Sequence, residues 1–274
     1  MVAARLGIIE PVFYGPASAQ GMLIAAGASS QQLRWVDTGD SAREAARIAV
    51  GDAAAKRVAL LMKGSLHTDE LLGAVLARDS GLRLSGRLTH TFVFDLPRYH
   101  KLLAVTDAVV NIAPDVQAKA ESLTHAIDLM RKMGVVAPKI AVLAAVETVH
   151  PSIPATLDAR TLAEWGASGH FGSATVHGPL GFDNAISAHA AAAKGITSAV
   201  AGDPDILLVP DLNCGNILYK SFVYIGGGEC AGVVQGGRVP IVLTSRADSL
   251  FSRVASCALA RIALRQASQN TPIC

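Results

Sequence analysis

Residues 241–249 read IVLTSRADS, and this stretch is the best indicator of the fold. An apolar run typical of a buried strand passes directly into two hydroxyls, a guanidinium and a carboxylate, at Thr244, Ser245, Arg246 and Asp248. A helical pattern follows at once. Polar residues at the carboxyl end of a strand are typical of ligand sites in α/β sheets. The stretch therefore predicts an α/β fold with a ligand bound at this strand end.

Composition agrees with that fold and limits the function. The chain has 274 residues, which at roughly 150 residues per domain allows two domains. Aromatic residues are few, at 5%, which suits tightly packed helix-on-sheet layers better than a β-sandwich. A net charge of +2 gives no basis for nucleic-acid binding, although it could serve a small polyanionic ligand. No apolar run reaches the roughly 18 residues of a membrane span.

Strand and helix patterns alternate along the chain, which indicates parallel sheets covered by helices. An α/β domain normally opens with a strand and then a helix, whereas this chain begins late in the first helix. We therefore expect the first strand to be missing and a chain extended upstream to be more thermostable.

A helix is expected at 115–134 and another starting near Thr68, and strands are expected at 58–64, 87–96, 104–114 and 139–147.

Three segments place polar residues between a strand and a helix: 64–72 (GSLHTDELL), 177–187 (HGPLGFDNAIS) and 244–249. Helix capping explains part of this pattern, because Ser, Thr, Asp and Asn satisfy the first helical N–H groups. Capping does not explain Arg246, since a cation in the first turn opposes the helix dipole. An anion held between the guanidinium and the helix amides would explain it.

Other motifs are absent or weak. The sequence has neither a phosphate-binding G-x-x-x-x-G-K-[ST] loop nor a G-x-S-x-G nucleophile elbow. GGGECA (226–231) matches G-x-G-x-x-A, and Asp248 follows at about the distance of a ribose-binding acid. However, the next segment is broken by glycines and resembles a strand, so a tight turn is favoured over dinucleotide binding. His67 and Asp69 lack the second pair of ligands that a metal site needs.

The four cysteines form no C-x-x-C pair, and no secretory signal precedes them. We expect free thiols in a reducing cytoplasm.

Long motifs in a fixed order resemble the phosphate acetyltransferase/phosphate butyryltransferase family, from about Leu6 to Ala260. The sequence of these motifs is most similar to the butyryl branch and to the transferase half of bifunctional enoyl-CoA hydratase/phosphate acetyltransferases. The motifs that carry the resemblance are LMKGSLHTDELLGAVL, GLRLSGRLTHTFVFDLPRYHKLLAVTDAVVNIAPD, KIAVLAAVETVHPSIPATLDA, HGPLGFDNAIS, KGITSAVAGDPDILLVPDLNCGNILYK and AGVVQGGRVPIVLTSRADS.

The resemblance implies a two-domain α/β/α sandwich like that of isocitrate and isopropylmalate dehydrogenases. The first domain would comprise 1–84 and 233–274, the inserted second domain 85–232, and the active site would lie in the cleft between them. The implied reaction is acyl-CoA plus inorganic phosphate in equilibrium with acyl phosphate plus CoA. It proceeds through a ternary complex, with CoA as a substrate, no permanently bound cofactor and no metal. The implied enzyme is a homodimer acting on acetyl-CoA or butyryl-CoA.

The resemblance also assigns residues. Arg246 would bind phosphate, and Ser245 would orient the CoA thiol. The acetyl branch has an aspartate base seven positions after this serine, where this chain has Ser252. Asp248 is therefore expected to be the base or to orient it, with helix capping as the alternative. The substrate-binding residues are expected to be Lys63, Ser65, His67, Thr68, Arg83, Arg87, Asp183 and Asn184.

A second departure from the acetyl branch is Gly73, where that branch has an arginine. Arg78, Arg83 and Arg87 could replace its charge at the CoA phosphates, or could form only a solvated basic surface.

Two further alternatives for the function stay open. The chain could be a catalytically impaired member of the family that binds CoA or acyl phosphate, or, on the GGGECA match alone, a dehydrogenase.

Overall fold

The computed structural model describes residues 1–25, 33–245 and 247–265. Two compact units can be distinguished by their internal contacts. Unit 1 combines Met1–Gly86 with Gly236–Leu264, and unit 2 contains Arg87–Gln235. No helix in the described part of the chain is both long enough and apolar enough to cross a membrane.

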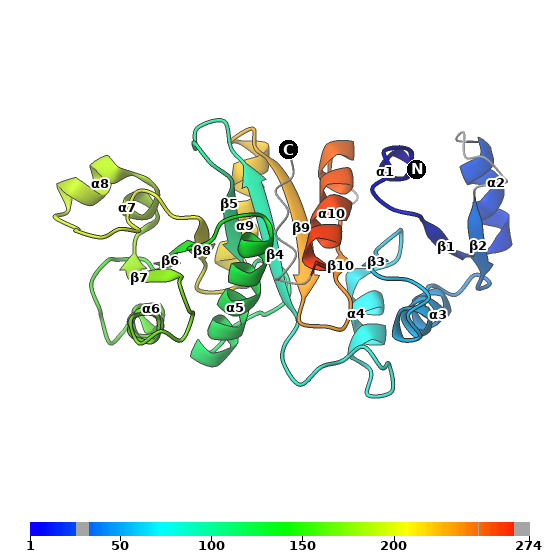
Figure 1. Cartoon of the computed structure of the whole chain (residues 1–274), viewed down its shortest axis with the longest axis horizontal. Helices are drawn as coiled ribbons and strands as arrows, with labels where there is room; N and C mark the ends of the chain where they lie inside the picture. The colour runs from blue at the N-terminus through cyan, green and yellow to red at the C-terminus, as the bar shows by residue number, and fades with distance from the viewer. Residues whose placement is uncertain (26–32, 246, 266–274) are drawn as a thin grey trace. The chain divides into compact units, whose positions relative to one another are not determined.

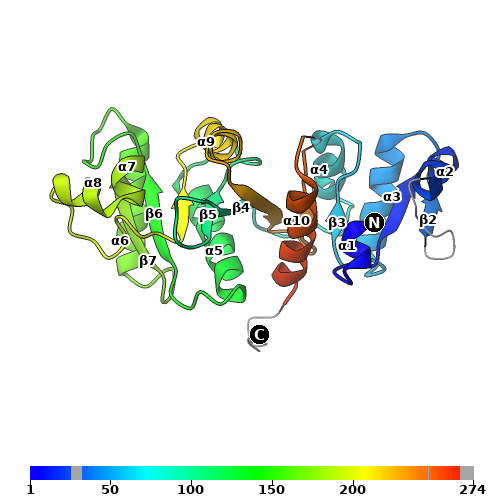
Figure 2. The same cartoon turned by 90° about the horizontal axis from the view of Figure 1, so that it is seen from above.

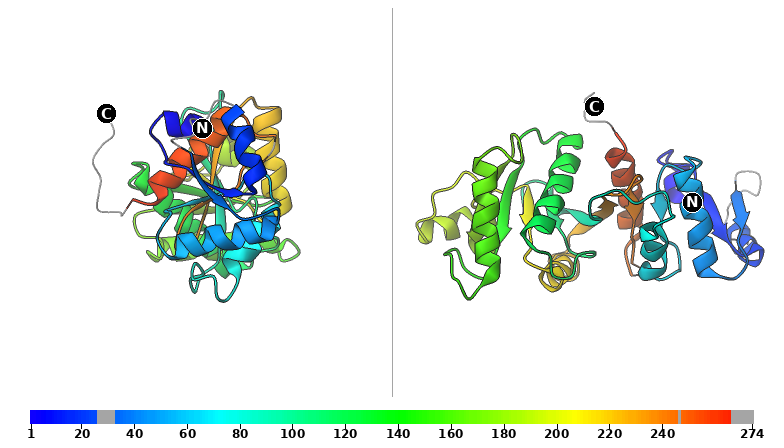
Figure 3. Two further views of the ribbon diagram at one scale, coloured as in Figure 1. Left: turned by 90° about the vertical axis from the view of Figure 1, so that its right-hand side faces the viewer. Right: turned by 90° about the horizontal axis from the view of Figure 1, so that it is seen from below.

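Unit 1 contains two pairs of parallel strands. β1 (Val12–Gly15) pairs with β2 (Arg34–Asp37), and β3 (Leu61–Met62) pairs with β10 (Ile241–Val242). Helix α1 lies beside α10 in this unit (Figure 3). The helices of the unit are α1 (Val2–Arg5), α2 (Ala17–Ala25), α3 (Ala42–Ala54), α4 (Thr68–Leu76) and α10 (Leu250–Ala263).

Helix α3 shows how local sequence builds unit 1. Ser41 begins the helix by accepting the Glu44 N–H at 3.3 Å, and buried residues recur at helical spacing, at Ala46, Ala49, Val50 and Ala53. Gly51 lies inside the helix, which continues to Ala54. A glycine inside a helix costs only about 1 kcal/mol relative to alanine, which the packing of the buried face can offset.

Unit 2 is built on a mixed sheet with the strand order β9-β4-β5-β8-β6-β7. Strands β5, β8, β6 and β7 are parallel, whereas β4 runs antiparallel to both β5 and β9. The prediction of purely parallel sheets is therefore wrong for β4. The strands are β4 (Thr89–Asp95), β5 (Leu103–Thr106), β6 (Lys139–Leu143), β7 (Thr175–Leu180), β8 (Ile206–Leu208) and β9 (Glu229–Gln235).

Helices cover both faces of this sheet, and α5 and α9 lie on opposite faces (Figures 1 and 2). On the α9 side, Phe92 stacks on Tyr219 with ring centroids 4.3 Å apart, inside the core of the unit. Burial on both faces explains the continuous apolar runs of the central strands. The helices are α5 (Val116–Lys132), α6 (Pro154–Ala167), α7 (Phe182–Ile186), α8 (Ala188–Ala193) and α9 (Leu212–Tyr224).

Two predicted elements of unit 2 show where sequence patterns succeed and fail. The helix expected at 115–134 is confirmed as α5, and Asp115 caps it by accepting the Ala118 N–H at 2.7 Å. The strand expected at 104–114 instead ends at Thr106. The Asp107 carboxylate accepts the N–H groups of residues 109, 110 and 111 at 3.0 to 3.2 Å, which turns the chain immediately after the strand.

Candidate active site

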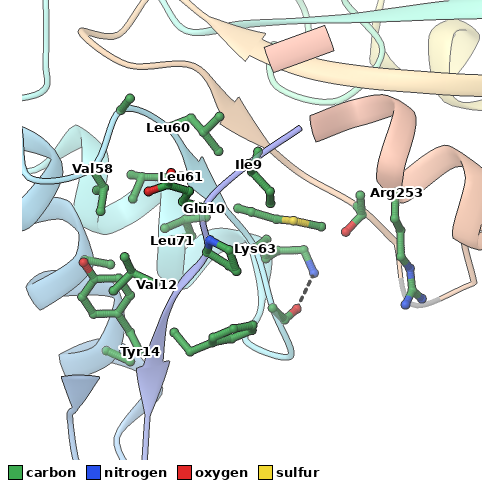
Figure 4. A pocket seen from close by; sticks show the side chains of 18 of the residues that line it. Ile9, Glu10, Val12, Tyr14, Val58, Leu60, Leu61, Lys63, Leu71 and Arg253 are labelled. Carbon is green, nitrogen blue, oxygen red and sulfur yellow. Dashed lines mark hydrogen bonds between the residues drawn. The ribbon is translucent and has the colours of Figure 1, made fainter. Parts of the chain in front are cut away.

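The paired strands β3 and β10 of unit 1 end beside each other. Leu61 lies opposite Ile241, and the Lys63 N–H donates to the Val242 carbonyl at 2.9 Å. The residues that follow both strands, Lys63 and Ser65 after β3 and Thr244 and Ser245 after β10, line one cavity of about 900 Å³. Figure 4 shows this cavity with Lys63 and with Arg253 of α10. The structure therefore brings three of the expected site residues, Lys63, Ser65 and Ser245, to a single cavity.

Lys63 brings a positive charge to this cavity although it is only 9% exposed. Its ammonium group donates to the carbonyls of Gly64 at 3.5 Å and Leu66 at 3.4 Å. Both distances are longer than the roughly 2.7–3.2 Å typical of N–H···O hydrogen bonds. A bound anion would be a stronger acceptor for the same group, because charge-assisted hydrogen bonds are shorter and stronger.

Ser245 is held by the loop that follows it. The Asp248 carboxylate accepts the Ser245 N–H at 2.6 Å, and the Asp248 N–H donates back to the Ser245 carbonyl at 3.2 Å. The Ala247 N–H donates to the Ser245 Oγ at 3.3 Å. Arg246, the expected phosphate ligand, lies outside the described residues.

The cap of helix α10 bears on the capping alternative for Asp248. Ser249 is the N-cap, and its Oγ accepts the Ser252 N–H at 3.0 Å. The capping alternative for Asp248 is therefore wrong, since its carboxylate bonds the Ser245 N–H. Ser252, which stands where the acetyl branch has its aspartate, is buried, and its hydroxyl lies 3.2 Å from the Ser249 hydroxyl.

The helix expected to start near Thr68 is confirmed as α4. His67 is its N-cap, and Thr68 is its first helical residue. The His67 N–H donates to the Glu70 carboxylate at 2.8 Å, so the acid in the first turn satisfies the start of the helix. Neither His67 nor Thr68 is among the residues that line the cavity.

Arg83 and Arg87, the two arginines expected to bind the CoA phosphates, have different surroundings. Arg83 is exposed in unit 1, where its backbone forms an isolated bridge with Gly237. Arg87, in unit 2, donates its N–H to Glu121 at 2.7 Å, and its guanidinium lies 3.9 Å from Glu121 and 4.0 Å from Asp115. Carboxylates facing the Arg87 side chain oppose the binding of an anion there.

Asp183 and Asn184 belong to a charged cluster in unit 2, at the start of α7 directly after β7. Lys194 lies 3.1 Å from a carboxylate oxygen of Asp183 and 3.1 Å from one of Glu147. Its hydrogen bonds lower the pKa of both carboxyls. Asn184 is fully buried and donates to Glu147 at 3.3 Å.

Sequence reasoning missed Lys194 and Glu147. They lie 47 residues apart in the chain, so no local spacing connects them. A Cβ at Gly181 would lie 2.8 Å from an Asp183 carboxylate oxygen, so a larger residue there would displace the Asp183 side chain.

Two alternative chemistries find no support in the described structure. Within residues 1–25, 33–245 and 247–265, no group of three or more His, Cys, Asp or Glu side chains could hold a metal ion. The GGGECA segment leads directly into β9, whereas the dinucleotide fingerprint requires a helix there. The dehydrogenase alternative rested on that match alone.

Comparison with known proteins identifies the family. The family model described as phosphate acetyl/butaryl transferase matches residues 38–261, and the chain belongs to this family. It is 44% identical over 269 residues to a phosphate acetyltransferase of Rhizobium meliloti, covering 97% of this chain and 85% of that protein. It is 46% identical over 217 residues to a probable phosphate butyryltransferase of Bacillus subtilis, covering 79% and 73%.

A solved structure gives the same result for the fold. The crystal structure of a branched-chain phosphotransacylase from Enterococcus faecalis V583 matches with a TM-score of 0.77 and 33% identity, covering 86% of this chain and 84% of that one. The expected family and the expected α/β fold class are thus confirmed.

Proposed function

We propose that this chain is a phosphate acyltransferase that moves a short acyl group reversibly between CoA and inorganic phosphate. The observation that carries the proposal is the shared cavity of Lys63, Ser65 and Ser245 at the ends of two paired strands. A buried cation beside hydroxyl donors suits a phosphate group that gains charge during the reaction. Names of relatives at 44% and 46% identity support the same activity.

In the direction of thioester synthesis, the sulfur of the CoA thiol attacks the carbonyl carbon of the acyl phosphate, and in the net reaction the thiol proton ends on the departing phosphate. The tetrahedral intermediate then collapses, the bond from carbon to the bridging oxygen breaks, and inorganic phosphate leaves. Lys63 and Arg246 would stabilise the charge on the phosphate. Ser245 would hydrogen-bond the reacting groups and orient the thiol. Much of the remaining acceleration would come from holding both substrates close together.

Asp248 has a defined part in this proposal. Its carboxylate already binds the Ser245 N–H at 2.6 Å, so it orients the serine rather than standing free as a base. We therefore assign Asp248 as a positioning residue.

The acyl group, acetyl or butyryl, is the next property of the proposed enzyme to test. The names of the relatives include both, and one methylene is worth only about 1–3 kcal/mol of discrimination in an apolar pocket. The assay is thioester formation from CoA with acetyl phosphate and with butyryl phosphate in parallel. The ratio of the two rates assigns the branch.

Variants test the site in the same assay. Ser245→Ala and Arg246→Ala are expected to lower turnover strongly while leaving the melting temperature unchanged. Arg98→Ala, at an exposed arginine of unit 2, is the matched control and should keep wild-type rates. Wild-type turnover in both site variants would refute the assignment.

A second candidate function is a member of the family that binds CoA or acyl phosphate without turning it over. The buried Ser252, at the position of the aspartate of the acetyl branch, favours it. CoA binding by calorimetry, together with no thioester from either acyl phosphate, would establish this alternative over the enzyme.

We also propose that the protein is a cytoplasmic homodimer. Helix α9 and the residue after it expose three large apolar side chains, with Ile217 66%, Tyr224 67% and Ile225 88% accessible. Such a surface favours association. Among the described residues, Cys214, Cys230 and Cys257 take part in no disulfide bond, as suits a reducing compartment, while Cys274 lies outside the described residues. Sedimentation of wild type against Ile217→Lys with Ile225→Lys tests the dimer.

A further inference from the structure

Arg253 is the fourth residue of helix α10, which begins directly after the loop of the candidate site. Its N–H donates to the carbonyl of the cap, Ser249, at 3.2 Å, so its guanidinium projects from the start of the helix. No acidic residue stands in the first turn of this helix. A cation near the start of a helix faces the positive end of the helix dipole, which is unfavourable. Helix stability therefore does not account for an arginine at this position.

The side chain of Arg253 borders the candidate active site. Arg253 lines the same cavity as Lys63, Ser65 and Ser245. Figure 4 shows Lys63 and Arg253 on the same side of this cavity. Helix α10 packs on β10, the strand that leads to Ser245. Packing of a helix on its preceding strand thus brings a second cation to the strand ends where Lys63 lies.

Positive charge predominates around these residues. Lys63 is only 9% exposed and Arg253 is half-buried. Among the described residues that line the cavity, Glu10 is the single acid. Asp248 lies beside the site, but its carboxylate accepts the Ser245 N–H at 2.6 Å. A phosphate group carries about two negative charges near neutral pH, so two cations match it in charge.

Two other arginines that line the cavity have different contacts. The guanidinium of Arg57 donates to the Asp52 carboxylate at 2.5 and 3.0 Å. Arg261, near the end of α10, donates to two backbone carbonyls at 3.0 and 3.2 Å. At about 1.5 Å per residue, Arg261 lies about 12 Å along the helix from Arg253. Because charges are screened over about 8 Å at physiological ionic strength, Arg261 would affect an anion at Arg253 only weakly.

We propose that Arg253 is a substrate-binding residue that holds, together with Lys63, the phosphate group of the acyl phosphate or of inorganic phosphate. The assignment rests on the phosphate acyltransferase activity proposed above. The guanidinium has paired N–H donors that match two phosphate oxygens, whereas the Lys63 ammonium acts as a point charge. Cations from β3 and from α10 would thus hold one phosphate group beside the hydroxyls of Ser65 and Ser245.

CoA is a second source of phosphate groups. Its phosphates are separated from its thiol by the long pantetheine arm, whereas the phosphate of an acyl phosphate is bonded to the carbonyl group that reacts. A cation beside Lys63 and Ser245 therefore fits the reacting phosphate better than those of CoA. A contact made equally before and during the reaction changes KM more than kcat, so Arg253 should act mainly on the KM for acyl phosphate.

Phosphate binding can be measured without turnover. The experiment titrates the full chain with inorganic phosphate at constant ionic strength and follows the melting temperature. For the wild type we expect a rise that saturates, as for any ligand of the folded state. Arg253→Gln should need about tenfold more phosphate or more for the same rise. Arg253→Lys, which keeps the charge but not the paired donors, should fall between the two.

A matched control lies in the same helix. Arg261→Gln also removes a cavity-lining cation from α10 and should keep the phosphate affinity of the wild type. Thioester formation from acetyl phosphate and CoA provides the second readout. In Arg253→Gln we expect the KM for acetyl phosphate to rise about tenfold or more, with kcat and the KM for CoA within about twofold of wild type.

Four results would overturn the proposal. Unchanged phosphate affinity in Arg253→Gln would exclude the contact, and a wild type that does not respond to phosphate would exclude the site. A higher KM for CoA alone would assign Arg253 to the CoA phosphates. Equal losses in Arg253→Gln and Arg261→Gln would show that the overall charge of the cavity, rather than a contact, attracts phosphate.

The inference and the proposed activity can fail separately. A wild-type chain that binds phosphate through Arg253 but forms no thioester would contradict the acyltransferase and leave the role of Arg253 in place. Normal turnover with the same KM for acetyl phosphate in the wild type and in Arg253→Gln would support the enzyme and contradict the role of Arg253.

Discussion

The contacts of Asp248 favour a positioning role for this residue over a role as the base. Its carboxylate bonds the Ser245 N–H at 2.6 Å, so an asparagine, which also carries an acceptor oxygen, should replace it in part. We predict that Asp248→Ala lowers kcat/KM by about tenfold or more, a loss of about 1.4 kcal/mol or more, and that Asp248→Asn loses clearly less. Steady-state kinetics of both variants across pH distinguish a positioning role of Asp248 from a role as the base. Equal losses in both, with the acidic limb of the profile removed, would make Asp248 the base instead.

At this scale the sequence predicted residues next to strand ends but not partners distant in the chain. Lys63 and Ser245 could be selected because each follows an apolar run, and paired strands end together. The ion pairs of Lys194 with Glu147 and Asp183 depend on how β6, β7 and α8 pack. No spacing in one sequence reports that packing.

Among the elements, α10 depends on a single cap. The Ser249 Oγ accepts the Ser252 N–H at 3.0 Å at the start of the helix that follows the candidate site. We predict that Ser249→Ala lowers the free energy of unfolding by about 1 kcal/mol. Urea unfolding measures the loss, with Ser85→Ala in an exposed turn as the control. Equal stability of the two variants would contradict the capping role.

Helices α5 and α6 are joined by a part-buried ion pair. Lys119 lies 2.6 Å from Asp158, and its side chain is only 6% exposed. Asp158→Ala would leave the ammonium group buried without its partner, and we predict a loss of about 3 kcal/mol or more. The double variant Lys119→Met with Asp158→Leu removes both charges and should be the more stable of the two in denaturant unfolding. A double variant no more stable than Asp158→Ala would show that the burial penalty has been misjudged.

The periodicity of apolar residues predicted the bounds of some elements but not the direction of every strand. Helix α5 was predicted almost to the residue, because its cap and its amphipathic spacing are both local. The direction of β4 could not be predicted. An apolar run such as residues 89–95 has the same pattern whether its neighbours run parallel or antiparallel, and β9, one of its partners, lies about 140 residues further along the chain.

For the molecule as a whole, three histidines with lowered pKa values contribute to the loss of stability in acid. Burial lowers the pKa of His90 to about 4, against a smaller opposing effect of Asp107, and burial also lowers the pKa of His125 and His177. All three lie in unit 2. Between pH 6.5 and about 4 the unfolded chain binds a proton at His90 that the folded chain does not, so stability falls as the pH falls through this window.

The slope that His90 alone contributes is at most about 1.4 kcal/mol per pH unit, and it disappears above pH 6.5, where both states are neutral. We predict that His90→Gln, which cannot titrate, flattens the decline in unfolding free energy between pH 6.5 and pH 4 but does not abolish it, because His125 and His177 still act in the same direction. Urea unfolding of both proteins at intervals across the window gives the two slopes. Identical slopes would mean that His90 gains a proton in the folded chain as readily as in the unfolded one, and burial would then not control the acid response.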